Sequence, residues 1–178
     1  EALKAFVLTI AARRARGQRD HNSMLVHVTR YTQVQEWVTE AVRQELLDMR
    51  DRLDYGEGAS QGTVRDEFRT LWKEDFEKSS RALGVEPDSW ETINALLSDV
   101  VASIEVKTLN GTARDALEYL EHRELGLNVI AIGGDKLARG LTLEGLSVSY
   151  FLRASRMYDT LMQMGRWFGY RPGYLDLC

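Results

Sequence analysis

LNVIAIGGDKLARGLT, residues 127–142, decides the fold class of this chain. Its first six residues, Leu127 to Ile132, form a short and almost uninterrupted apolar run, which is typical of a strand buried on both faces of a parallel sheet. The residues that follow, Gly133 to Thr142, are polar and rich in glycine, so they predict a loop at the carboxyl end of that strand. Because open α/β sheets bind ligands at the carboxyl ends of their strands, this stretch predicts a binding site together with the strand.

Strand and helix patterns alternate on both sides of this stretch. Further strands are predicted at residues 24–29 (MLVHVT), 100–109 and 146–151. Helices are predicted at residues 2–16, 32–53, 64–83 and 155–168. Another helix is predicted to start after a cap at Asp88 or Ser89, and a further one to run from Thr112 to about His122. The alternation from residue 24 onward predicts an α/β fold with a mainly parallel sheet and helical crossovers.

The size and composition of the chain fit one domain. Of its 178 residues 44% are hydrophobic, so a single core over residues 1–178 is predicted. No stretch approaches the roughly 18 apolar residues of a membrane span, and the N-terminal segment has no cleavable apolar block. The single cysteine, Cys178, excludes a disulfide framework and a cysteine-based metal site. These features predict a cytoplasmic protein that does not enter a membrane.

The loop at residues 133–142 carries side chains suited to an anion. Its glycines expose backbone amides, and Lys136 and Arg139 offer cations to phosphate oxygens. The alternative is a tight turn in which Arg139 pairs with a surface carboxylate. The pattern of a P-loop is absent from the whole chain. Residues 129–178 hold six basic and four acidic residues in a chain of net charge −4, so an anion-binding surface, or an ordinary solvated one, is expected there.

A second segment, residues 161–174 (LMQMGRWFGYRPGY), places arginines around an aromatic turn. Planar guanidinium groups such as those of Arg166 and Arg171 stabilise the charge on a transferring phosphoryl group, and a neighbouring lobe often delivers them. The aromatic residues Trp167, Phe168 and Tyr170 favour packing in a core or an interface over base stacking.

The loop after the buried strand resembles motif V of superfamily 2 helicases, whose pattern is Thr-Asp-x-x-Ala-Arg-Gly-x-Asp. The residues that match this pattern in register are Asp135, Ala138, Arg139 and Gly140. The Gly165-Arg166 pair resembles the core of motif VI in the same family. The MLVHVT strand with Arg30 and Tyr31 is similar to motif IV, and residues 106–111 (VKTLNG) are similar to the family's next strand and its glycine turn. The resemblance covers roughly residues 23–174, apart from a helical block.

The resemblance implies a three-layer RecA-like lobe, the second of two, with a helical insertion at residues 54–100. ATP and Mg²⁺ would bind mainly to a first lobe outside this chain, and DNA would bind along this one. The implied site residues are catalytic Arg166, Arg171 and Gln163; nucleotide-binding Gly140, Thr142 and Arg139; and nucleic-acid-binding Gly134, Asp135, Lys136 and Arg30. The sequence departs from the family at Thr142, which replaces an aspartate, at Gly134, which replaces a threonine, and at Gly169, where a second arginine is usual.

The phrases LVHVTRYTQVQ, GGDKLARGLTLEGLSV and QMGRWFGYRPGY resemble the Z-one (Z1) domain of bacterial endonucleases more closely still. In that family the module accompanies a superfamily 2 helicase region in systems that resemble restriction-modification. The resemblance therefore implies DNA processing, with restriction-modification or defence subunits as further partners, and does not identify the part that cuts.

Two other classes of function stay open. The first is a docking module in a defence complex that has lost its nucleotide contacts, which Thr142 favours. The second is a metal-dependent nuclease, since Asp99, Glu105 and Lys107 form a weak version of the pattern in which such enzymes hold a metal. The histidines His21, His27 and His122 lack metal-ligand spacing, so packing or surface roles are expected for them.

Overall fold

The computed structural model describes residues 1–56, 63–109, 126–134, 143–152 and 173–178. The chain is α/β and divides into two compact units. The helical unit comprises residues 1–19, 44–103 and 172–178, and the sheet unit comprises residues 20–43 and 104–171. The long helix α2 (Thr32–Tyr55) begins in the sheet unit and ends in the helical unit.

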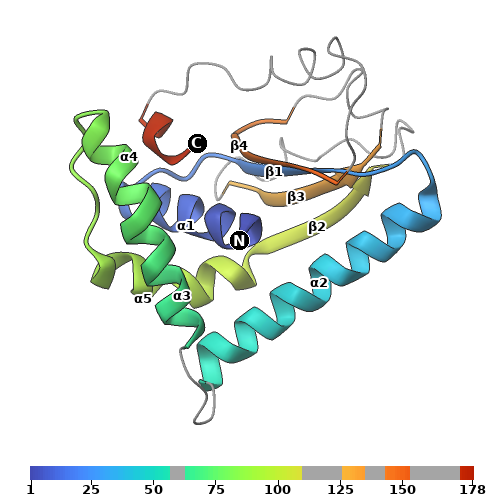
Figure 1. Cartoon of the computed structure of the whole chain (residues 1–178), viewed down its shortest axis with the longest axis horizontal. Helices are drawn as coiled ribbons and strands as arrows, with labels where there is room; N and C mark the ends of the chain where they lie inside the picture. The colour runs from blue at the N-terminus through green and yellow to red at the C-terminus, as the bar shows by residue number, and fades with distance from the viewer. Residues whose placement is uncertain (57–62, 110–125, 135–142, 153–172) are drawn as a thin grey trace. The chain divides into compact units, whose positions relative to one another are not determined.

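The sheet unit contains four parallel strands: β1 (Asn22–His27), β2 (Ile104–Leu109), β3 (Asn128–Gly133) and β4 (Leu146–Phe151). Their order is β2-β3-β1-β4, so the two central strands are β3 and β1 (Figure 1). Every residue of both central strands is buried, which confirms the predicted buried strand, although β3 begins and ends one residue later than the predicted residues 127–132.

One face of the sheet forms an apolar core with the loops that precede β3 and β4. Its buried members are Leu25, Leu109, Leu127, Val129, Ala131, Leu143 and Leu146, with Phe151 packed against them. The amides of Asn22 and Asn128 form a buried hydrogen bond of 2.7 Å between β1 and β3. The hydroxyl of Thr39 on α2 lies 2.6 Å from the hydroxyl of Thr108 on β2, so a hydrogen bond joins the first half of α2 to this strand.

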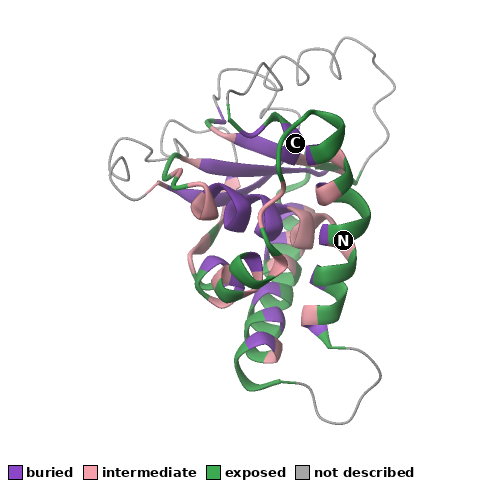
Figure 2. Ribbon diagram, turned by 90° about the vertical axis from the view of Figure 1, so that its left-hand side faces the viewer, coloured by how far each residue is buried: buried purple, intermediate pink, exposed green. Residues whose placement is uncertain are grey.

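The helical unit is built from α1 (Ala2–Ala15), α3 (Val64–Leu71), a π-helical turn (Trp72–Phe76), α4 (Glu77–Ala82), α5 (Trp90–Ala102) and a final 3-10 turn (Leu175–Leu177). Helix α1 packs against α5 and α3, and their contacting sides are buried (Figure 2). The single helix predicted at residues 64–83 is continuous but contains the π-helical turn, where Trp72 and Phe76 stack with ring centroids 5.6 Å apart.

Local capping sets the start of two helices. Thr63 and Asp66 form a reciprocal capping box at the start of α3, and Ser89 caps α5, as one of the two predicted caps. The strand predicted at residues 100–109 is wrong in its first part, because residues 100–102 complete α5 and β2 begins at Ile104. Val100 and Val101 have the branched side chains of strand residues, but both are buried in the helical unit.

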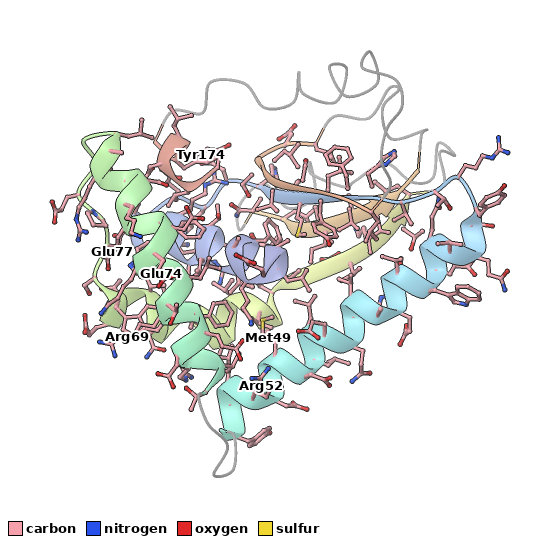
Figure 3. The ribbon with its side chains drawn as sticks, viewed as in Figure 1. Met49, Arg52, Arg69, Glu74, Glu77 and Tyr174 are labelled. Atoms are coloured by element: carbon pink, nitrogen blue, oxygen red, sulfur yellow. The ribbon has the colours of Figure 1, made fainter. Side chains whose placement is uncertain are left out.

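The end of the chain is fastened to α1 within the helical unit. Two Arg16 nitrogens donate to the Asp176 carboxylate at 2.9 and 2.7 Å, and the Ser80 hydroxyl donates to it at 2.7 Å. The Thr9 hydroxyl donates to the Leu177 carbonyl, and the Arg13 guanidinium lies 3.9 Å from the centroid of the Tyr174 ring, which Figure 3 labels.

These contacts change the acidity of Asp176. Burial acts to raise the pKa of its carboxyl, but the hydrogen bonds from Arg16 and Ser80 and the charge of Arg16 outweigh it and hold the pKa below its usual range. The hydrogen bond to Asp176 likewise raises the pKa of Arg16. The pair is therefore fully ionised at neutral pH.

Candidate functional site at the carboxyl ends of the strands

The four strands end level with one another. In the register of the sheet, Gly133 lies opposite both Leu109 and His27, and His27 lies opposite Phe151. The segments that follow the strands therefore start side by side along one edge of the sheet (Figure 1). These segments include the two stretches in which most of the predicted site residues lie, namely the loop after β3 and the segment after β4.

The connections from the two central strands run in opposite directions at this edge. The chain leaves β1 for β2, which lies beyond β3, whereas it leaves β3 for β4, which lies beyond β1. In open α/β sheets, ligands bind in the crevice where the connections of neighbouring strands part in this way. Gly134 comes directly after β3 and Arg30 lies three residues after the end of β1, so both predicted nucleic-acid residues within the described chain lie close to this point.

Gly134 is in close contact with the turn that follows β1. A Cβ atom at this position would lie 2.7 Å from the Thr29 carbonyl oxygen and 3.1 Å from the Arg30 Cα. A side chain at this position would therefore displace the backbone of residues 29–30.

The turn after β1 is held by hydrogen bonds. The Gln35 side chain donates to the Thr29 carbonyl at 2.8 Å, and the Tyr31 amide donates to the Thr29 hydroxyl at 3.2 Å. Gln35 is buried, whereas Arg30 and Tyr31 are exposed. The Arg30 guanidinium lies over the Tyr31 ring, 5.5 Å from its centroid. A fixed backbone thus presents a cation and an aromatic ring to solvent.

The two described histidines take part in packing. His27 is buried, and its ring is tilted against Phe151 with the centroids 5.6 Å apart. The His21 Nδ1 accepts a hydrogen bond of 3.0 Å from the Leu127 amide. Across residues 1–56, 63–109, 126–134, 143–152 and 173–178 there is no group of three His, Cys, Asp or Glu side chains that could hold a metal ion.

The residues of the nuclease alternative do not share one element. Glu105 and Lys107 lie on β2, where their side chains form an ion pair of 3.3 Å. Asp99 lies on α5, in the helical unit, where its charge acts on Arg14. Asp99, which lies before the strand predicted at residues 100–109, is therefore on a different element from Glu105 and Lys107.

Several predictions fall outside the described residues. They include the helices at residues 112–122 and 155–168, and His122. The site residues concerned are Asp135, Lys136, Arg139, Gly140, Thr142, Gln163, Arg166 and Arg171. Their proposed roles remain predictions.

Two features of this edge were not predicted from the sequence. The exposed ring of Tyr31 was noted within a motif, but no role was assigned to it. The contact between Gly134 and Thr29 joins residues far apart in the chain, and a glycine at the end of a strand gives no sign of its partner. The edge itself was predicted, because the strands of a parallel sheet place all their carboxyl ends together.

The family model of the Z1 domain matches this chain over residues 1–178. No curated protein and no solved structure matches it. Among the described residues, no helix is long and apolar enough to cross a membrane.

Proposed function

This chain belongs to the Z1 domain family, and we propose that it forms the second RecA-like lobe of a DNA-dependent ATPase of the superfamily 2 helicase or translocase type. The activity would serve an endonuclease or a system that resembles restriction-modification. In this proposal a first lobe supplies the phosphate-binding lysine and the Mg²⁺ ligands, because this chain has no P-loop pattern. The lobe described here supplies contacts to DNA and an arginine to the nucleotide.

The observation that supports this proposal best is the common edge at which the four parallel strands end. The loop that resembles motif V starts after β3, and the segment that resembles motif VI starts after β4, on the opposite side of β1. A ligand at this edge would be within reach of both. A motor lobe needs that arrangement, since one segment must respond to nucleotide and the other to DNA.

Within the proposal the residues have distinct tasks. Arg166, with Arg171 and Gln163 beside it in sequence, would face the γ-phosphate of ATP bound to the first lobe. Arg139, Gly140 and Thr142 would adjoin the nucleotide. Gly134, Asp135, Lys136 and Arg30 would couple this cleft to DNA, and the phosphate contacts among them would make binding dependent on salt.

The test is ATP hydrolysis, with and without DNA, by the whole protein that contains this chain. Arg166→Ala should lower DNA-stimulated hydrolysis by about a thousandfold or more, the scale of an arginine finger, while ATP binding is largely kept. Arg69→Ala is the matched control, because Arg69 is exposed on α3 in the helical unit (Figure 3). An unchanged rate in Arg166→Ala would contradict the motor and favour the docking module.

The nuclease alternative has its own test. Lys107→Ala in the same protein should leave DNA cleavage unchanged if the ion pair of Lys107 with Glu105 is a structural contact. Loss of cleavage, with binding of DNA retained, would assign the chemistry to β2 instead.

A further inference from the structure

The turn between β1 and α2 carries an aromatic ring that no proposed function has used. Tyr31 is 61% exposed, and the guanidinium of Arg30 lies over its ring at 5.5 Å. Within the described residues no carboxylate forms an ion pair with Arg30. An exposed ring beside a cation is the combination with which proteins stack a base and hold the neighbouring phosphate.

We propose that the Arg30–Tyr31 turn binds a single strand of nucleic acid, with a base stacked on Tyr31 and the adjacent phosphate held by Arg30. This inference rests on the proposed function for the presence of nucleic acid at this edge. It adds the strandedness of the substrate and a role for Tyr31, to which none was assigned from the sequence.

The backbone under the ring is fixed before any ligand arrives. Gln35 donates to the Thr29 carbonyl at 2.8 Å, and the Gln35 amide donates to the Tyr31 carbonyl at 3.2 Å. On the other side, the backbone of the turn lies so close to Gly134 that no side chain fits between them. A stacking platform on a braced turn loses little conformational entropy on binding, which distinguishes it from a ring at the tip of a free loop.

The chemistry of the turn favours an unpaired strand over a duplex or a protein. Bases in a duplex are already stacked on their neighbours, so a ring can take the place of a neighbour only where the strand is open. Thr32 and Gln33, which follow Tyr31 in the chain, are polar and exposed, so the ring has polar neighbours on that side. The contact of the turn with Gly134 places the strand of nucleic acid beside the end of β3.

The experiment measures the affinity of the whole protein for a fluorescently labelled oligothymidylate and for a duplex of the same length. Tyr31→Ala should weaken binding of the single strand by roughly tenfold, the scale of one base stacked on an aromatic ring, and should change duplex binding little. Tyr31→Phe keeps a ring and should bind normally. Arg30→Ala should also weaken binding and should reduce the dependence on salt by about one phosphate contact.

Two variants serve as matched controls in the helical unit. Tyr55 is a tyrosine that is 87% exposed, and Arg69 is an exposed arginine, so Tyr55→Ala and Arg69→Ala remove the same groups elsewhere. Because all four side chains are exposed, none of these substitutions should unfold the protein. Gly134→Ala, in contrast, should displace the turn and lower single-strand affinity with Tyr31 still present.

The outcomes separate this inference from the motor. If Tyr31→Ala binds the single strand as well as Tyr55→Ala does, or loses duplex binding to the same extent, the stacking contact is overturned. That result together with normal, Arg166-dependent hydrolysis of ATP leaves the motor in place without this contact. Single-strand binding that depends on Tyr31, in a protein whose ATP hydrolysis ignores DNA, supports the contact and contradicts the motor.

Discussion

Different kinds of interaction stabilise the helical unit and the sheet unit, each considered by itself. In the helical unit, partly buried arginines join distant segments: Arg16 joins α1 to Asp176 and Asp88, and Arg65 joins α3 to the Asn94 side chain and the Leu53 carbonyl. In the sheet unit, apolar strands pack closely, and glycines allow backbone to touch backbone. We therefore expect the removal of a charge to destabilise the helical unit, and the addition of a side-chain atom at a close backbone contact to distort the sheet unit.

The glycines show the contrast directly. Gly145, at the start of β4, has a φ of +66°, and a Cβ atom there would lie 1.8 Å from the His21 carbonyl oxygen. Gly84, after α4, has a similar φ of +72°, but a Cβ atom there would meet nothing within 4 Å. The same substitution thus meets conformational strain alone in one unit, and strain together with a backbone collision in the other.

The largest effect is expected for Gly145→Ala. The collision must move the backbone that pairs β1 with β4, so we expect a loss of about 3–5 kcal/mol in the free energy of unfolding, measured by urea denaturation. Gly84→Ala, the control, should lose about 1 kcal/mol, because it requires only the unfavourable φ. Equal losses in the two variants would contradict the difference between the units.

Much of this architecture follows from local sequence. The strand predicted at residues 146–151 has the observed bounds of β4, and the helix predicted at residues 32–53 ends within two residues of α2. Period and capping suffice for such elements because both depend on neighbouring residues. The first predicted strand begins at residue 24 and omits the polar residues Asn22 and Ser23, which belong to β1. Asn22 pairs with Asn128, which lies far away in the chain, so no local pattern could reveal it.

The candidate site was predictable to a smaller extent. The carboxyl edge follows from the parallel strands, and the sequence places Arg30 and Gly134 directly after two of them. The packing of Gly134 against Thr29 and the exposure of Tyr31 depend on contacts between segments, which no local pattern contains. The same limit explains why Val100 and Val101 were assigned to a strand.

The second largest effect is expected for Asp176→Asn in the helical unit. The substitution leaves Arg16 without its buried carboxylate, but Arg16 keeps its ion pair with Asp88 at 3.1 Å. We therefore expect the free energy of unfolding, measured with denaturant, to fall by about 2–3 kcal/mol, which is at or below the low end of the range for a broken buried pair. The control is Asp54→Asn, which removes an exposed pair with Arg50 and should lose less than about 0.5 kcal/mol.

A smaller effect, which separates charge from packing, is the dependence of stability on pH. The Asp176 pKa is held below its unfolded value, so the carboxylate contributes stability that is fully present above the unfolded pKa of about 3.9 and is lost as the pH falls through the folded pKa. The loss should be smaller than in Asp176→Asn at neutral pH, because most of it develops only below the unfolded pKa. Urea unfolding measured from pH 7 to pH 3 should show a steeper decline for the wild type than for Asp176→Asn. Gly145→Ala removes no titrating group, so its free energy of unfolding should fall with pH at the wild-type slope. Parallel curves of unfolding free energy against pH for all three proteins would show that the Arg16–Asp176 pair does not stabilise the helical unit through its charge.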